Sequence, residues 1–238
     1  MSFMLGYSYP MLQQGLKIPV NASTDSHLIV IGGSGSGKTT AVLYWMYKIS
    51  NQNVTFYIAD FKASHEFMGI SEYFAEFEES YHLIKRFYDD FLITPEGGDN
   101  RIKILLIDEI AGLLTHFSAS KEGKVKSDEI RAIMSSVLML GRSRRCFLWL
   151  SMQRYTASIF PAASGSADNF HISVGLGNLS VDGRKGLFAG EHFEGEDELR
   201  YGRGKGIVMI DGQTLTGVVI PMVSKQRLQE LLQRQNMA

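Results

Sequence analysis

The chain has 238 residues, 45% of them hydrophobic, and a formal net charge of −1. These values fit a single domain over residues 1–238, with an N-terminal lead-in over 1–26 and a closing helix over 224–238, and they exclude a globally basic nucleic-acid binder. No apolar run approaches the ~20 residues of a membrane span, no signal peptide is recognisable, and Cys146 is the single cysteine, so a cytoplasmic protein is expected.

Buried strands alternate with helices along the chain. The strands are near-continuous apolar runs, which is typical of an α/β fold with a mainly parallel central sheet flanked by helices. Strands are predicted over His27–Ile31, Val54–Ala59, Ile102–Ile107, Cys146–Ser151, Phe170–Leu176, Gly206–Ile210 and Leu215–Ile220. Apolar residues at helical spacing predict helices over Lys38–Ile49, over 79–92, from Ser127 as N-cap to a stop at Gly141, and over 224–235, with a polar loop over Ser118–Lys126.

A glycine-rich loop joins the first predicted strand to the first helix, and it fits the pattern G-x-x-x-x-G-K-[ST]. Backbone N–H groups of such a loop point inward around a phosphate, a shape that glycine adopts at low cost, and the next helix presents its positive end to the anion. Lys38 would contact the β- and γ-phosphates, and Thr39 would ligate Mg²⁺. The predicted nucleotide-binding residues are Gly32, Gly33, Ser34, Gly35, Ser36, Gly37, Lys38, Thr39 and Thr40.

The third predicted strand ends in two carboxylates, Asp108 and Glu109. Sheets of α/β proteins bind ligands at the carboxyl ends of their strands, so Asp108 would hold Mg²⁺, directly or through water, and Glu109 would polarise the attacking water. This pair favours ATP hydrolysis by a P-loop protein with an additional strand in its sheet. The sequence contains neither the N-K-x-D motif that reads guanine nor the L-S-G-G-Q signature of transporter ATPases.

Polar residues flank the predicted strand Cys146–Ser151. Gln153 lies just past it, and in such folds this strand can lie beside the P-loop strand, which would put Gln153 near the γ-phosphate. Arg142, Arg144 and Arg145 precede it, and one of them could act as an arginine finger on a neighbouring subunit's nucleotide, with Arg142 preferred and Arg145 as the runner-up. Clustered arginines also leave a small-molecule kinase open, because such enzymes close an arginine-bearing lid.

The order of these motifs resembles that of the FtsK/HerA superfamily of hexameric DNA-pumping ATPases, and the likeness covers roughly residues 15–222. The likeness begins with the segment from His27 through the glycine-rich loop to Thr40, followed by Asp60-Phe61-Lys62, which resembles the family's Asp-x-Lys. Ile107-Asp108-Glu109-Ile110-Ala111 resembles its Walker B motif. Further matches are Gly141-Arg142 with Ser151-Met152-Gln153-Arg154, and Gly202-Arg203-Gly204-Lys205-Gly206 near the family's late glycine-rich turn. The sequence departs from the family at Tyr155, where the family has proline.

The resemblance implies a RecA-like P-loop NTPase with ATP and Mg²⁺ as cofactors. It also implies an FtsK/SpoIIIE-like motor that translocates double-stranded DNA without sequence preference, assembled as a homo-oligomeric, hexameric ring. The usual membrane anchor and winged-helix module are not recognisable, so a membrane or capsid protein is the expected partner. Conjugation, segregation and virus packaging stay open as the process served. A protein-export ATPase of the same superfamily and a P-loop small-molecule kinase are the alternatives.

The positive surface for DNA would be local, because the net charge is near zero. Contacts to phosphates rather than bases would make DNA binding salt-sensitive and independent of sequence. Arg203 and Lys205 are expected to lie outside the phosphate site. The full set of candidates is Arg154 with the loop Ala162–Asn169, Arg184, Lys185, Arg200, Arg203 and Lys205.

Overall fold

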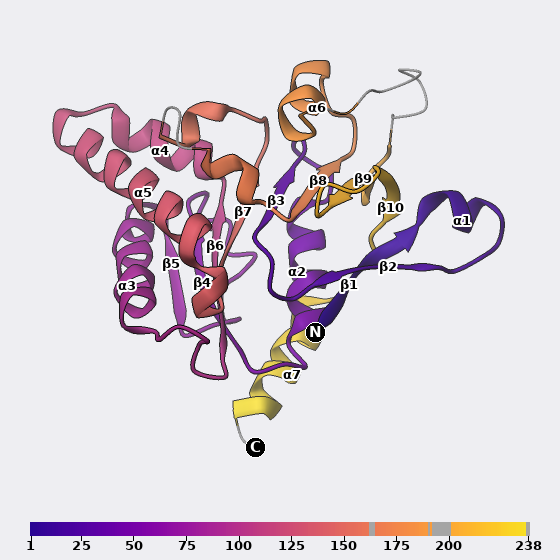
Figure 1. Ribbon diagram of the computed structural model, residues 1–238, viewed down its shortest axis with the longest axis horizontal. Coiled ribbons are helices and arrows are strands. Elements are labelled where there is room, and N and C mark those ends of the chain that lie inside the picture. The colour runs from indigo at the N-terminus through magenta and orange to yellow at the C-terminus, as the bar shows by residue number, and fades with distance from the viewer. Residues whose placement is uncertain (162–164, 190, 192–200, 237–238) are drawn as a thin grey trace.

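The computed structural model describes residues 1–161, 165–189, 191 and 201–236 (Figure 1). Its strands form one ten-stranded sheet in the order β2-β1-β10-β9-β8-β3-β7-β6-β4-β5. The strands are β1 (Ser2–Ser8), β2 (Pro19–Ser23), β3 (Leu28–Ile31), β4 (Val54–Asp60), β5 (Tyr73–Glu76), β6 (Ile102–Asp108), β7 (Cys146–Met152), β8 (Ile172–Leu176), β9 (Lys205–Ile210) and β10 (Thr216–Val219). The α-helices are α1 (Tyr9–Gln13), α2 (Lys38–Ile49), α3 (Ser80–Ile93), α4 (Ile110–Ser118), α5 (Lys121–Leu140), α6 (Val181–Leu187) and α7 (Lys225–Asn236), and the 3₁₀ turns are η1 (Phe77–Glu79), η2 (Arg142–Arg144), η3 (Ala157–Ile159) and η4 (Ser166–Asn169).

Parallel pairing joins β8, β3, β7, β6, β4 and β5. The strands β9, β10, β1 and β2 continue the sheet by antiparallel pairing. Within the parallel part, β7 lies between β3, which leads into the glycine-rich loop, and β6, which ends at Asp108. The predicted α/β fold with a mainly parallel sheet is therefore confirmed, and β7 is the additional strand that the Asp-Glu pair indicates.

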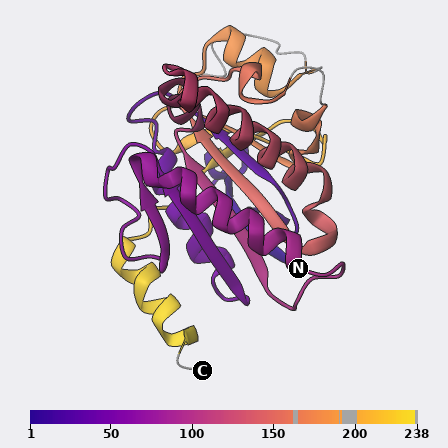
Figure 2. The same cartoon turned by 90° about the vertical axis from the view of Figure 1, so that its left-hand side faces the viewer.

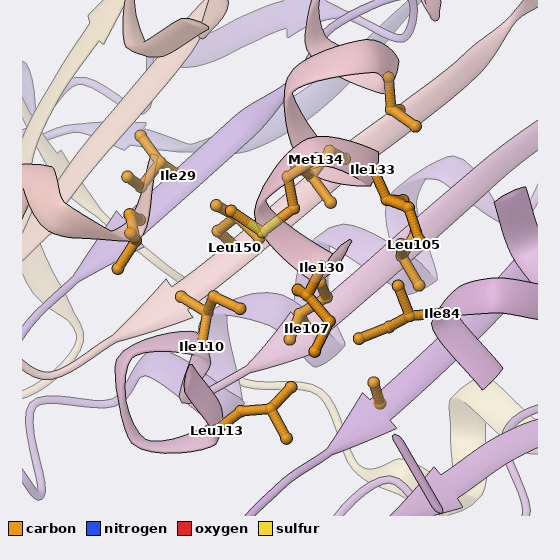
Figure 3. Packing of buried hydrophobic residues seen from close by; sticks show 14 of the residues in the cluster. Ile29, Ile84, Leu105, Ile107, Ile110, Leu113, Ile130, Ile133, Met134 and Leu150 are labelled. Carbon is orange, nitrogen blue, oxygen red and sulfur yellow. The ribbon is translucent and has the colours of Figure 1, made fainter. Parts of the chain in front are cut away.

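Helices cover both faces of the parallel strands (Figure 2). Ile29 and Ile31 of β3 belong to the core under α3, α4 and α5, whereas Leu28 and Val30 belong to the core under α2 and α7. Figure 3 shows the first of these cores, in which side chains of β6 and β7 meet those of α4 and α5. Burial on both faces explains why the strands read as continuous apolar runs.

The polar stretch Ser118–Lys126, predicted as a loop, is largely helical. After α4 ends, α5 begins at Lys121, and the Ser120 Oγ caps it by accepting a hydrogen bond from the N–H of Gly123 at 3.0 Å. Ser127, the predicted N-cap, instead lies inside α5. The prediction was wrong because lysine and glutamate favour helix, although the first turns of α5 carry no apolar stripe to reveal it.

The N-terminal stretch 1–26, expected as a lead-in, contributes β1 and β2 to the sheet. Trp45 of α2 donates a hydrogen bond from its Nε1 to the carbonyl oxygen of Leu5 in β1 at 2.9 Å, which ties the helix after the glycine-rich loop to this part of the sheet. The short elements β5 and α6 also had no predicted counterpart. Within the described ranges, no helix combines the length and the apolar character needed to cross a bilayer.

Candidate functional site

The glycine-rich loop leaves β3 at the carboxyl edge of the parallel strands and enters α2. Gly35 and Gly37 have φ angles of +77° and +99°, which glycine adopts without strain. A Cβ atom on Gly33 or Gly35 would meet nothing within 4 Å among the described residues, so the loop borders open space. No side chain of the described chain caps the N-terminus of α2, which leaves its first N–H groups for an anion.

The same loop is packed tightly on its other side. A Cβ atom on Gly32 would lie 2.5 Å from the Ser36 Oγ, so only glycine fits there. The N–H of Gly204 donates a hydrogen bond to the carbonyl oxygen of Ser36 at 2.9 Å, and a Cβ atom on Gly37 would lie 3.6 Å from the Arg203 Cγ. The turn before β9 therefore supports the loop directly.

Lys38 begins α2 and is buried within the loop. Its Nζ donates hydrogen bonds to the carbonyl oxygens of Gly32 at 2.5 Å and Gly33 at 3.3 Å. Burial lowers the pKa of this ammonium, and the charge of Lys62 lowers it further. The loop thus keeps a desolvated cation at the place where the motif predicts the β- and γ-phosphates.

Polar side chains line up across the ends of β4, β6 and β7. The parallel register pairs Asp60 with Asp108 and pairs Asp108 with Ser151. Burial raises the pKa of both carboxyl groups, and the charge of Asp60 adds to the shift of Asp108. The buried Asp60 Oδ1 has no hydrogen-bond partner among the described residues. A nearby cation would compensate these buried oxygens.

Glu109 follows β6 with the left-handed backbone angles φ 59° and ψ 48° and serves as the N-cap residue of α4. Its Oε2 lies 3.0 Å from the Nζ of Lys62, which follows β4. Burial alone would lower the pKa of Lys62, but its interaction with Glu109 and the charges of Asp108 and Asp60 outweigh burial, and the net shift is upward. A Cβ atom on Gly112 would lie 3.2 Å from the Glu109 Cγ, so this glycine gives the glutamate room.

Gln153 comes directly after β7. Met152, the last residue of β7, pairs with Ile31, the last residue of β3, and Ser151 pairs with Asp108 on the other side. Gln153 therefore leaves the sheet between the glycine-rich loop and the carboxylates, and its predicted place near a γ-phosphate stays a prediction.

The residues present fit a magnesium-bound nucleotide. The glycines border open space, Lys38 lies in the loop, and Asp108 with the unpartnered Asp60 Oδ1 follows on the adjoining strand ends. Thr39 and Asp108 would hold Mg²⁺, which supplies charge neutralisation on the phosphates. The sequence analysis assigned no role to Lys62, although this residue belongs to the Asp-x-Lys motif on which the family resemblance rests.

The three arginines of the predicted finger cluster lie at the other end of β7. Arg144 donates to the carbonyl oxygens of Leu92, at 3.3 Å, and Thr94, and Arg145 Nε lies 3.9 Å from the Asp25 Oδ1. Arg142 is exposed, and its Nη1 lies 3.5 Å from the His171 Nε2. Arg142 thus remains the most accessible of the three, while its role as a finger stays a prediction.

The predicted DNA-contacting residues that the structure describes differ in exposure. Arg184 is buried, with 8% of its surface exposed, whereas Lys185 and Arg154 are exposed. Arg203 lies beside the packed side of the glycine-rich loop, where a Cβ atom on Gly37 would be 3.6 Å from its Cγ, and its expected place outside the phosphate site stays a prediction. The Lys205 Nζ lies 5.1 Å from the centre of the Tyr9 ring. Arg200 and residues 162–164 lie outside the described residues.

This sheet order, the glycine-rich loop with Lys38 and the Asp108-Glu109 pair define the fold of a P-loop NTPase domain. The fold is similar to that of the pCW3 conjugation coupling protein TcpA, solved with ATPγS, at a TM-score of 0.78 and 16% identity, covering 98% of this chain and 70% of TcpA. It is also similar to the cytoplasmic domain of the type VII secretion ATPase EccC of Thermomonospora curvata, at a TM-score of 0.69 and 16% identity, covering 98% of this chain.

A third similar structure is the genome packaging NTPase B204 of Sulfolobus turreted icosahedral virus 2 with ATPγS, at a TM-score of 0.53 and 13% identity, covering 84% of this chain and 100% of B204. The chain spans 30% of the EccC chain and 49% of EssC from Geobacillus thermodenitrificans. No protein-family profile matches the sequence, and no curated protein matches it. These likenesses confirm the predicted fold.

Proposed function

We propose that this P-loop ATPase is a ring-forming motor that hydrolyses ATP to translocate double-stranded DNA. The observation that carries the proposal is the meeting of Lys38, Asp108 and Glu109 at one edge of the sheet, with β7 between their strands. The motor would work in the cytoplasm with a membrane or capsid protein as its partner.

In the proposed reaction, the loop N–H groups and Lys38 hold the phosphates, and Thr39 and Asp108 hold Mg²⁺. Glu109 accepts a proton from the attacking water while the oxygen of that water forms a bond to the γ-phosphorus. The bond from that phosphorus to the bridging oxygen breaks, and ADP leaves with the electron pair. Gln153 would orient groups near the γ-phosphate, and Arg142 of a neighbouring subunit would stabilise the charge that develops there.

The DNA part of the proposal is supported by the fold likeness to a conjugation coupling protein and to a genome packaging NTPase. The likeness to the secretion ATPases EccC and EssC supports protein export as the second candidate. A small-molecule kinase has less support, because Arg142, Arg144 and Arg145 lie at the far end of β7 and cannot close over the phosphate loop of their own chain.

The test is the rate of ATP hydrolysis by the purified protein against DNA concentration at two salt concentrations. Duplexes of unrelated sequence should all stimulate hydrolysis, and log K for DNA should fall linearly with log salt, by about 0.9 per phosphate neutralised. Stimulation by a secretion-signal peptide and not by DNA would favour export. A strong preference for one DNA sequence would contradict a non-specific motor.

A variant on α6 tests where DNA binds. Lys185→Ala should lower the salt slope and the DNA stimulation without changing the basal rate, because Lys185 is exposed and lies outside the phosphate loop. Lys17→Ala is the matched control, since Lys17 is exposed in the connection between α1 and β2. Identical curves for both variants would remove Lys185 from the DNA path.

A further inference from the structure

Lys62 lies inside the candidate site, where it is paired with the residue that should activate water. Its Nζ is 3.0 Å from the Glu109 Oε2, and the side chains of Lys62 and Glu109 are 38% and 12% exposed. An ammonium at this distance holds the Glu109 carboxylate in an ion pair, so an attacking water would have to compete with Lys62 for that carboxylate. Efficient hydrolysis therefore requires this ion pair to separate.

Lys62 also faces the second ammonium of the site. After burial, the charge of Lys62 is the largest influence that lowers the pKa of Lys38, and Asp108 and Glu109 act on both lysines. Both ammonium groups are therefore close enough to Asp108 and Glu109 to interact electrostatically with the same two carboxylates. They repel each other, and a phosphate group placed between them would attract both.

The backbone on each side of the pair is held in unusual conformations. Glu109 has φ 59° and Ala63, the residue after Lys62, has φ 50°, both in the left-handed region that side chains other than glycine rarely adopt. Asp60 closes the turn beyond them, because its Oδ2 accepts hydrogen bonds from the N–H at 3.2 Å and the Oγ–H at 2.9 Å of Ser64. Such costly conformations cluster at ligand clamps and switch regions.

We propose that Lys62 exchanges partners during the ATPase cycle, pairing with Glu109 until ATP binds and then moving to the γ-phosphate, which frees Glu109 to take the proton of the attacking water. This inference rests on the proposed ATP-hydrolysing function. Lys62 then distinguishes ATP from ADP, because only ATP carries the phosphate group that competes with Glu109 for its ammonium.

The experiment measures equilibrium binding of ATPγS and ADP, each with Mg²⁺, to the full chain. Lys62→Ala should weaken ATPγS binding about 10- to 100-fold, as expected for one charge-assisted hydrogen bond, and should leave ADP binding within about twofold. Lys62→Arg, which keeps the charge, should recover most of the ATPγS affinity. Lys85→Ala is the matched control, because Lys85 pairs with Glu129 at 2.9 Å away from the site and its loss should change neither affinity.

A second arm tests the exchange itself. Glu109→Gln removes the competing partner, so it should tighten ATPγS binding more when Lys62 is present than in the Lys62→Ala background, while ADP binding stays the same in all variants. An equal effect of Glu109→Gln in both backgrounds would overturn the exchange. So would a Lys62→Ala variant that loses ADP and ATPγS affinity by the same factor, because Lys62 would then act only on general structure or charge.

Failure of this inference is distinguishable from failure of the proposed function. If the wild-type protein binds neither nucleotide, or if Lys38→Ala changes neither affinity, the nucleotide site itself is wrong and both proposals fall. If wild-type binding depends on Lys38 and the Lys62→Ala variant keeps the wild-type preference for ATPγS over ADP, only the exchange by Lys62 falls.

Discussion

Asp60, Asp108 and Glu109 crowd three carboxyl groups onto adjoining strand ends, and Lys38 and Lys62 bring two ammonium groups to the same place. Burial raises the pKa of Asp60 and Asp108 and lowers that of Lys38, so each group is held in an environment that disfavours its charge. A bound cation and a bound phosphate would compensate these charges. Nucleotide with Mg²⁺ should therefore raise the melting temperature, because a ligand that binds only the folded state stabilises it.

The roles of the two carboxylates of the Asp-Glu pair should separate on mutation. Glu109→Gln keeps the shape but loses the proton acceptor, so hydrolysis should fall by about 10²–10⁴-fold while ATP binding persists. Asp108→Ala should lose activity and magnesium dependence together. Steady-state hydrolysis and ATPγS binding measure both effects. Normal turnover in Glu109→Gln would show that another group takes the proton.

At the scale of elements, His27 completes the pairing of β3 with β7. It stands immediately before β3, and its Nδ1 accepts a hydrogen bond from the backbone N–H of Leu148 at 2.9 Å. Burial, together with the smaller effects of the His171 and Arg142 charges, lowers the pKa of His27 to about 3. The strand junction therefore depends on a neutral imidazole.

This dependence predicts acid sensitivity. The pKa of His27 is about 3 in the folded state against 6.5 ordinarily, so the unfolded chain takes up the proton first and stability falls as pH drops from about 6.5 toward 3. Between pH 7 and pH 5 this group alone should remove about 2 kcal/mol. His27→Asn keeps an acceptor that does not titrate, so urea unfolding at both pH values should show that much less loss than in wild type.

A control for that measurement is His82→Asn, because His82 is exposed on α3 and its replacement should keep the wild-type loss of stability. If the wild-type and His27→Asn profiles run parallel between pH 7 and pH 5, the imidazole of His27 is not the source of the acid sensitivity.

The start of α5 gives a second prediction at this scale. Ser120→Ala removes the oxygen that caps the N–H of Gly123, so the free energy of unfolding should fall by about 1 kcal/mol. Ser136→Ala is the matched control, because Ser136 is half-buried within the same helix and its hydroxyl donates to the carbonyl oxygen of Ala132 at 3.0 Å. Equal stability of the two variants would argue against Ser120 as the cap.

The sequence predicted those helices and strands whose boundaries are marked by local residue patterns. The bounds of α2 match the prediction because the glycine-rich loop ends where α2 begins and the polar Ser50 follows its last apolar residue. The strand β5 was not predicted at all, because Tyr73–Glu76 is short, half-buried and paired with β4 alone, so its existence depends on a neighbour. β1 and β2 likewise become visible only through the sheet that they join.

The candidate site divides in the same way. The phosphate loop and the Asp-Glu pair are contiguous motifs, so the sequence predicts them. The contact between Lys62 and Glu109 depends on the register that sets Asp60 beside Asp108. The support that the turn before β9 gives to Ser36 joins segments from opposite ends of the chain. Packing of the whole sheet determines both contacts, and no local pattern reveals them.

At the scale of the whole molecule, the glycine-rich loop and Arg142 lie at opposite ends of the parallel strands. The seven residues of β7 run from one end to the other, which separates the loop from Arg142 by roughly 20 Å. An Arg142 that completes a nucleotide site must therefore belong to another subunit, joined head to tail, and such contacts close into a ring when their rotation permits.

Mixing two inactive variants tests this arrangement. Arg142→Ala subunits lack the finger and Glu109→Gln subunits lack the base, so mixed rings contain some interfaces with both groups intact and should regain part of the hydrolysis. Arg145→Ala mixed with Glu109→Gln tests the runner-up in the same way. No recovery in mixtures whose co-assembly is proven would exclude Arg142 as the finger.

The separation of Arg142 from Lys38 along β7 also sets how the enzyme responds to dilution. If the finger is Arg142 of another subunit, an isolated chain has all the parts of a site but no complete one. Turnover per chain should then rise with protein concentration and level off once assembly is complete, instead of staying constant as for a self-sufficient enzyme. A template that gathers chains, such as a DNA duplex, would raise turnover most in dilute protein and least where assembly is already complete.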